Sequence, residues 1–175
     1  MKLKDPILDT LIVMCPQNSF FDPSGSVYIG PKTIDLKLRL QDYMSTFSGM
    51  KIIFREIHSE SDKFFSKDKT HSIANTSDSL IIPELKKYAS ICCNKTRYNA
   101  FYDTDLDSIL KQNKAKSVLV AGVETHTSVL FTVEELLNRS YEVSIIEPLL
   151  GARDEYFHSC AISLMVDQLG VNVIT

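Results

Sequence analysis

The feature that most constrains the fold is the run SVLVAGV, residues 117–123, which is apolar on both faces. A sheet strand with one solvated face alternates apolar and polar residues, whereas a strand covered on both faces is a continuous apolar run. The run TLIVM at residues 10–14 has the same character. Strands of this kind need helices on both sides of their sheet, so the pattern predicts an α/β protein.

Segments with helical periodicity separate these runs. We expect further strands at 51–57, 88–93, 142–147 and 171–174, and helices after Pro31, at 105–112, after residue 123 and at 154–170. The alternation predicts a three-layer αβα sandwich with a central, mostly parallel six-stranded sheet. A chain of 175 residues has the size of one domain, which we expect to span residues 1–175.

Composition narrows the classes of function. Hydrophobic residues make up 44% of the chain and charged residues 23%, and the formal net charge of −3 comes without long runs of one sign. Nothing therefore favours binding to nucleic acid or to a membrane surface. The four cysteines form no CxxC pair, which argues against a cysteine zinc site or a redox motif. A cytoplasmic protein with free thiols is expected.

Polar segments follow the predicted strands, and in a parallel sheet ligands bind beyond the carboxyl ends of the strands. The residues in these positions read CPQNSFF after the first strand, REIHSE at the second, NKTRYNAF after the third and GVETHTSV at the fourth. Residues 59–79 form a long polar stretch without periodicity. Loops of this length often cover a site.

On these four segments, which keep their order and spacing, the chain resembles the isochorismatase-like cysteine hydrolases, and within them the nicotinamidase-like branch. The resemblance implies an aspartate after the first strand, a lysine after the third and a cysteine where a helix begins. It implies that the cysteine attacks a carbonyl carbon, the aspartate moves protons and the lysine stabilises negative charge. A cis peptide just after the glycine of the fourth strand is implied to help build an oxyanion hole.

Two of these three catalytic positions are substituted. Lys95 falls on the lysine, but Cys15 occupies the aspartate position and Ser128 the cysteine position. A cysteine at a helix start beside a lysine attacks as a thiolate, whereas a serine hydroxyl needs a partnered base. The base position now holds a thiol, so Ser128 has no evident proton acceptor in the sequence.

Two alternative ways of activating a nucleophile stay open. His126 could serve as the base, although residues two apart on a helix do not face one another. Alternatively Cys15 could be the nucleophile, because a neighbouring Lys95 ammonium favours its thiolate, although it would attack from the side of the base. Otherwise Cys15 is a small buried thiol at a strand end.

The resemblance also implies a metal site at Glu56, His58 and His71, with glutamate where metal-binding relatives have aspartate. One carboxylate and two imidazoles suit zinc or iron. No other cofactor is expected to be required, and the histidines could instead pin the long loop by hydrogen bonds.

Further residues are implied to contact a substrate. Phe20 and Phe101 are expected to line the pocket, or else to belong to the core. Gly122, Val123 and Glu124 form the turn at the end of the fourth strand. Arg97 could pair with an anionic substrate or face solvent.

Two functions of different class follow. The first is a hydrolase acting on a small amide or a related C–N bond, with weakened catalysis. The second is a degenerate family member that binds a small ligand or a protein partner without turnover. A small-molecule ligand and self-association into a homo-oligomer are expected in either case, with no nucleic acid and no membrane.

Overall fold

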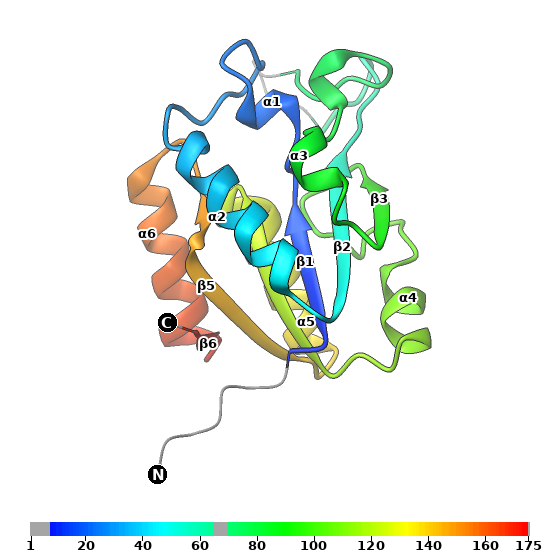
Figure 1. The fold of residues 1–175 in the computed structure, drawn as a ribbon, viewed down its shortest axis with the longest axis vertical. Coiled ribbons are helices and arrows are strands. Elements are labelled where there is room, and N and C mark those ends of the chain that lie inside the picture. Colours follow the sequence, from blue (N-terminus) through cyan, green and yellow to red (C-terminus); the bar gives the residue numbers. More distant parts are fainter. Residues whose placement is uncertain (1–7, 65–69, 175) are drawn as a thin grey trace.

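A parallel six-stranded sheet forms the centre of the molecule (Figure 1). The computed structural model describes residues 8–64 and 70–174. Its strands are β1 Thr10–Met14, β2 Met50–Glu56, β3 Ile91–Lys95, β4 Ser117–Val123, β5 Glu142–Gly151 and β6 Asn172–Val173. The spatial order is β3-β2-β1-β4-β5-β6, and each described pairing is parallel. The predicted α/β class and central sheet are confirmed.

Helices cover the sheet on both faces. They are α1 Asn18–Phe21, α2 Thr33–Thr46, α3 Pro83–Lys86, α4 Leu106–Gln112, α5 Leu130–Asn138 and α6 Glu155–Ser163. α2 crosses the near face of the sheet in Figure 1 and α5 lies behind it. Right-handed crossovers require this arrangement, because the chain leaves β1 toward β2 but leaves β4 in the opposite direction, toward β5.

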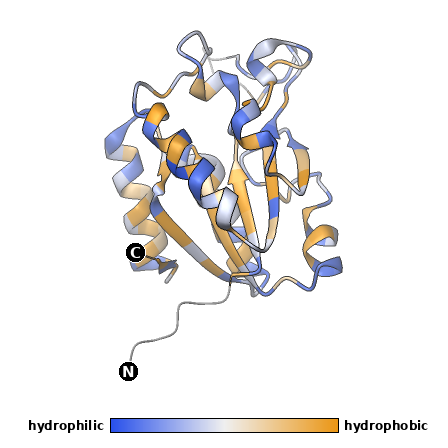
Figure 2. Cartoon of the chain, viewed as in Figure 1, coloured by the Kyte–Doolittle hydropathy of each residue, from blue (hydrophilic) through white to orange (hydrophobic). Residues whose placement is uncertain are grey.

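The core lies between the sheet and these helices. All five residues of β1 and all seven of β4 are buried, as their apolar runs require. Leu36, Leu40 and Met44 of α2 supply the opposing apolar stripe from successive turns of the helix. Figure 2 shows this distribution, with hydrophobic residues concentrated along the central strands.

The third strand begins later than expected. The sequence predicted residues 88–93, but β3 spans Ile91–Lys95, in direct register with Ile52–Glu56 of β2. Tyr88 and Ala89 instead close the turn after α3, because their backbone N–H groups donate to carbonyls of that short helix. Lys95 is therefore the last residue of the strand, paired across the register with Glu56.

Two other predicted segments also differ in extent. β5 runs to Gly151 rather than ending at 147, and its pairing with β4 shifts register between Val120 and Gly122. The last helix, predicted over 154–170, is α6 followed by a π-helical turn at Leu164–Gln168. In the long polar stretch, residues 65–69 lie outside the described residues, and a short 3₁₀ turn occupies Ser77–Ser79.

The strand order places a site at the centre of the carboxyl edge. The connections from β1 and β4 leave in opposite directions, so the adjacent ends of these strands form the switch point at which open parallel sheets bind ligands. In the part of the chain that the structure describes, no helix is long and apolar enough to cross a membrane.

Gly122 makes the close approach of β1 and β4 possible. Its φ is +101°, and a Cβ atom built there would lie 2.2 Å from the backbone oxygen of Met14. Gly170 also has a positive φ, of +69°, but a Cβ there would meet nothing within 4 Å. Alanine at Gly170 would therefore introduce backbone strain alone, whereas alanine at Gly122 would add a steric clash with β1.

We expect Gly122→Ala to lower the free energy of unfolding by at least about 3 kcal/mol, because a clash with β1 adds to the left-handed strain. Gly170→Ala is the matched control and carries the strain alone, about 1–2 kcal/mol. Urea denaturation followed by circular dichroism measures both. Equal losses in the two variants would contradict the role assigned to Gly122.

Candidate functional site

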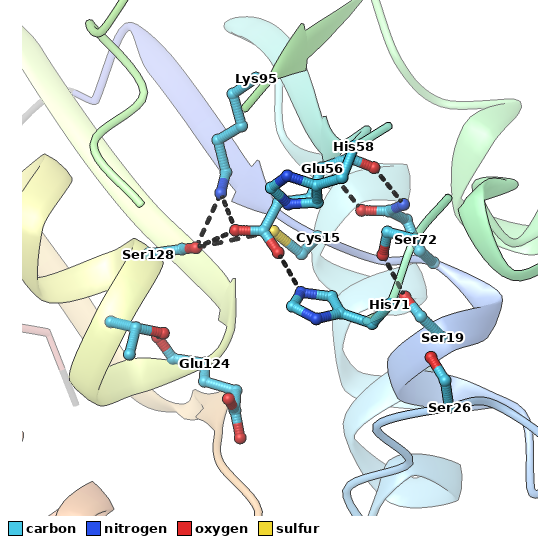
Figure 3. A network of polar contacts seen from close by, with 12 residues as sticks. Cys15, Ser19, Ser26, Glu56, His58, His71, Ser72, Lys95, Glu124 and Ser128 are labelled. Carbon is cyan, nitrogen blue, oxygen red and sulfur yellow. Dashed lines mark hydrogen bonds and ion pairs between the residues drawn. The ribbon is translucent and has the colours of Figure 1, made fainter. Parts of the chain in front are cut away.

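A buried ring of three polar side chains lies at the carboxyl ends of β2, β3 and β4 (Figure 3). The Lys95 Nζ atom donates to Glu56 Oε1 at 2.5 Å and to Ser128 Oγ at 2.8 Å. The Ser128 hydroxyl in turn donates to Glu56 Oε1 at 3.2 Å. The three residues are almost completely buried, with exposed fractions of 1% or 2%. The ring is therefore a closed set of charge-assisted hydrogen bonds.

The electrostatics of the ring favour the ion pair. Burial alone would raise the pKa of the Glu56 carboxyl, but the Lys95 charge and the hydrogen bond from His71 outweigh it and lower that pKa. Burial would likewise lower the pKa of Lys95, but the neighbouring Cys15 and Glu56 side chains outweigh it and raise that pKa. At neutral pH the pair therefore consists of a carboxylate and an ammonium group.

Gln17 fixes the backbone that carries Glu56. Its side-chain oxygen accepts the Glu56 N–H at 2.6 Å, and its amide nitrogen donates to the Glu56 carbonyl at 2.9 Å. The same nitrogen donates to the Ser79 carbonyl at 3.1 Å. One buried side chain therefore ties the start of α1 to the end of β2 and to the long loop.

Cys15 joins the ring from the end of β1. Its Sγ atom lies 3.7 Å from Ser128 Oγ, and its backbone N–H donates to the Phe54 carbonyl at 2.8 Å. The residue has a φ of 47°, a left-handed conformation that is uncommon outside glycine. Burial raises the pKa of the Cys15 thiol to about 12, although the neighbouring Lys95 charge opposes this shift. The thiol is therefore protonated at neutral pH.

Ser128 lies in a single π-helical turn, Thr125–Val129, which leads directly into α5. Turns of this kind recur at functional sites because they redirect side chains. The peptide bond between Val123 and Glu124 is cis, as the family resemblance implied. His126 stacks on Phe157, with ring centroids 5.4 Å apart, and therefore lies against α6.

Glu56, His58 and His71 form a cluster of metal-binding type. Their candidate ligand atoms all lie within 4.8 Å of one another, and Glu56 Oε2 is 3.0 Å from His71 Nε2. His58 Nδ1 lies 3.1 Å from Asp62 Oδ2, and a carboxylate at this nitrogen typically orients a histidine ligand through its other nitrogen. The donor set fits zinc or iron(II), with Glu56 shared between this cluster and the ring.

A cavity of about 170 Å³ opens above the ring. Its lining residues are Phe20, Val27, Glu56, Phe64, His71, Tyr98, Glu124, Thr127, Ser128 and Arg153. Phe64 and Tyr98 meet edge to face with centroids 4.8 Å apart, and Phe20 meets His71 in the same way at 5.7 Å. The cavity is therefore lined by aromatic side chains together with the buried Ser128 and Glu56.

Most predicted site residues come together here. Cys15, Lys95 and Ser128 lie in contact, and Phe20 and Glu124 line the cavity. Gly122 and Val123 are buried in β4, directly before the cis peptide. Phe101 lies elsewhere, because its ring packs under the Arg139 guanidinium at 4.5 Å. Arg97 donates to Asp62 and lies over the Phe64 ring, so its charge is already compensated.

The sequence did not single out Phe64 or Arg153, which also line the cavity. Arg153 N and Nε donate to Glu124 Oε1 at 3.1 and 3.0 Å, and Nη2 lies 3.3 Å from Oε2. Arg153 follows the carboxyl end of the fifth strand, and ligands bind beyond the carboxyl ends of strands in a parallel sheet. The place of Arg153 after a predicted strand could therefore have identified it as a candidate site residue.

The buried ion pair makes a prediction about stability. Glu56→Gln leaves the Lys95 ammonium buried beside a neutral amide, so we expect the free energy of unfolding at pH 7 to fall by about 3–5 kcal/mol. The matched control is Glu84→Gln, because Glu84 pairs with Lys37 in a partly exposed position, and its change should stay below about 1 kcal/mol. Chemical denaturation measures both variants.

The contribution of Glu56 to the free energy of unfolding decreases as the pH falls. Glu56 has a pKa below the ordinary carboxyl value of 4.5, so its contribution is present above pH 4.5 and is lost as pH falls below it. The stability difference between the native protein and Glu56→Gln should therefore shrink between pH 5 and pH 3. A difference that stays constant over this range would contradict the assigned pairing.

Comparisons with known proteins place this arrangement in a family. A family model described as "Isochorismatase domain" matches residues 10–175. A relative from Arabidopsis thaliana, described as a "probable inactive nicotinamidase", is 29% identical over 124 residues, 70% of this chain and 61% of the relative. The matched segments span less than two thirds of the length of the curated relatives.

Solved structures share the fold. The L. infantum protein PnC1, in complex with nicotinate, has a TM-score of 0.88 at 20% identity and covers 97% of this chain and 93% of its own. A Pyrococcus horikoshii pyrazinamidase in complex with zinc has a TM-score of 0.86 at 22% identity, with coverages of 95% and 98%. The family match extends over most of the chain, and this protein belongs to the isochorismatase family.

Proposed function

We propose that this protein binds a small, planar, polar ligand in the cavity above Ser128 without hydrolysing it through the family's cysteine chemistry. The observation that carries the proposal is the closed ring of Lys95, Glu56 and Ser128 beside a protonated Cys15. The family membership and the similarity to a relative described as a probable inactive nicotinamidase support it.

Each group that could activate a nucleophile is already committed. Ser128 donates to Glu56, but a carboxylate whose pKa is held low is a poor proton acceptor near neutral pH. Lys95 is an ammonium group and has no lone pair to accept the proton. Burial raises the pKa of Cys15 to about 12, so its thiol stays protonated at neutral pH.

The cavity suits a small planar molecule. A volume of about 170 Å³ leaves room for one small substituted ring. Phe20, Phe64 and Tyr98 offer ring faces and edges on its sides. Ser128 and Thr127 also line the cavity, and a ligand amide could form hydrogen bonds with their hydroxyl groups.

Zinc or iron(II) at Glu56, His58 and His71 would supply a positive charge at the inner end of the cavity. The protein's own residues would hold it through one carboxylate oxygen and two imidazoles, with Asp62 orienting His58. The other oxygen of Glu56 would still accept from Lys95 and Ser128.

One observation favours a second function, hydrolysis with Ser128 as the nucleophile. The Ser128 hydroxyl already donates to Glu56 Oε1, which is the contact that a nucleophile makes with its base. In this reaction Glu56 would take the Ser128 proton and pass it to the departing ammonia as Ser128 Oγ forms an ester with the amide carbon and the C–N bond breaks. Water would then hydrolyse the ester to the carboxylic acid and restore Ser128. The ammonium group of Lys95 would face the negative charge that develops on the carbonyl oxygen.

Cysteine labelling tests the state of Cys15. We expect iodoacetamide at pH 8 to label the exposed Cys92 first and Cys15 at least about a hundredfold more slowly, because thiol reactivity follows thiolate content and access. Mass spectrometry of digested native protein gives the rate at each site. If Cys15 were labelled fastest of the four cysteines, it would be an activated nucleophile.

Turnover assays separate the two functions. We expect no ammonia release from nicotinamide, pyrazinamide or benzamide by the native protein, while at least one of them raises its melting temperature. Ammonia release that disappears in Ser128→Ala would decide for the second function.

A complementary experiment introduces the residues that the family resemblance implies at positions 15 and 128. Cys15→Asp combined with Ser128→Cys supplies both a proton carrier and a thiolate nucleophile beside Lys95. We expect ammonia release at least about a hundredfold above the native background, the usual scale of one general base. Cys15→Asp alone is the matched control, since it lacks the nucleophile and should stay at background.

A further inference from the structure

We propose that His158 is a positioning residue for the ligand site, because its Nδ1–H group holds Thr125 and thereby the turn that presents Ser128. The inference rests on the proposed ligand-binding function and adds to it a residue outside the cavity. His158 lies on α6 and is almost completely buried, with an exposed fraction of 8%. It is not among the described residues that line the cavity above Ser128, so its influence on a ligand passes through Thr125.

The direction of the hydrogen bonds at Thr125 follows from the chemistry of the groups. Its Oγ1 atom lies 3.0 Å from the Gly151 carbonyl oxygen and 2.8 Å from His158 Nδ1. A carbonyl oxygen can only accept, so the single hydroxyl proton of Thr125 is donated to Gly151. The hydroxyl oxygen must then accept from His158 Nδ1, which therefore carries a proton whether the ring is neutral or charged.

Thr125 anchors one end of the turn that contains Ser128. It is the first residue of the π-helical turn Thr125–Val129 and is fully buried. Its hydroxyl group reaches the end of β5 at Gly151 and the helix α6 at His158. Further along the same turn, the Ser128 hydroxyl reaches the buried ion pair of the ring. The turn is therefore held from two sides, and Ser128 lies between them.

Loss of the His158 donor would weaken one of these two attachments. The Thr125 hydroxyl would keep Gly151 as its acceptor but would lose its second partner, in a place that water does not reach. The turn would then be less firmly fixed at the end that precedes Thr127 and Ser128, which both line the cavity. Hydrogen bonds behind the lining residues determine how precisely a binding site is held. We therefore expect ligand affinity to depend on the donor at position 158.

Asparagine and glutamine at position 158 separate hydrogen bonding from packing. Asparagine carries its amide nitrogen on Cγ, where histidine carries Nδ1, so it can donate to Thr125. Glutamine is the larger side chain and the better helix former, but its amide nitrogen lies one bond further from the backbone. A hydrogen-bonding role predicts that His158→Asn preserves the ligand site, whereas a packing role predicts that His158→Gln preserves it.

Isothermal titration calorimetry with nicotinamide, pyrazinamide and benzamide measures the effect on binding. For each amide that binds the native protein, His158→Asn should change the dissociation constant less than about threefold. His158→Gln should weaken binding at least about tenfold, because the Thr125 hydroxyl has lost its donor. Affinity in His158→Gln that equals or exceeds the affinity in His158→Asn would overturn the inference. Native protein that binds none of the three amides overturns the proposed function instead.

NMR of the ligand-free protein, labelled with a nitrogen isotope, tests the position of the turn independently of any ligand. The His158 ring should carry a proton on Nδ1, and its signal is identified by its absence in His158→Asn. The backbone N–H signals of Thr127 and Ser128 should stay close to their native positions in His158→Asn and shift in His158→Gln. Signals that respond at least as much to His158→Asn, or a native ring protonated only on Nε2, contradict the assigned role. If His158→Gln does not fold, the native ring signal and His158→Asn decide.

Discussion

The structure of the site depends on one buried ion pair, between Lys95 and Glu56. The two residues are cross-strand neighbours at the carboxyl ends of β3 and β2, so the sheet register itself brings them together. An unpaired ammonium at this depth would be strongly unfavourable, whereas a paired one fixes the direction of both side chains. Gln17 then holds the Glu56 backbone, and Ser128 fits against the pair.

If positions 15, 56 and 128 are substituted as the family resemblance implies, this pair explains how the changes fit together. With a thiol at Cys15, the end of β1 supplies Lys95 with no carboxylate. Glutamate at position 56 is one methylene longer than aspartate, and its Oε1 atom reaches both Lys95 and Ser128. Its other oxygen still faces His71. A single side chain therefore links the metal-type cluster to Ser128.

The sequence was informative where local pattern decides structure. Unbroken apolar runs predicted β1 and β4, and the order of elements predicted the layers, because both depend on burial. Residues 88–90 were misassigned to the third strand, since the N–H groups of Tyr88 and Ala89 close a short helix and the strand begins only after Ser90. The contact of Glu56 with Ser128 joins positions 72 residues apart, and that of Glu124 with Arg153 joins positions 29 apart. The spacing of residues along the chain does not predict contacts between positions so far apart.

The proposed binding without turnover has an electrostatic basis. Catalysis of acyl transfer needs a base that can accept a proton and fixed charges that stabilise the charge developing in the transition state. Here each of the two carboxylates at the cavity is engaged by a cation, Glu56 by Lys95 and Glu124 by Arg153. Lining charges that are matched in this way complement a neutral ground state better than a developing oxyanion. We therefore propose that the arrangement that stabilises these buried charges also opposes the family's reaction.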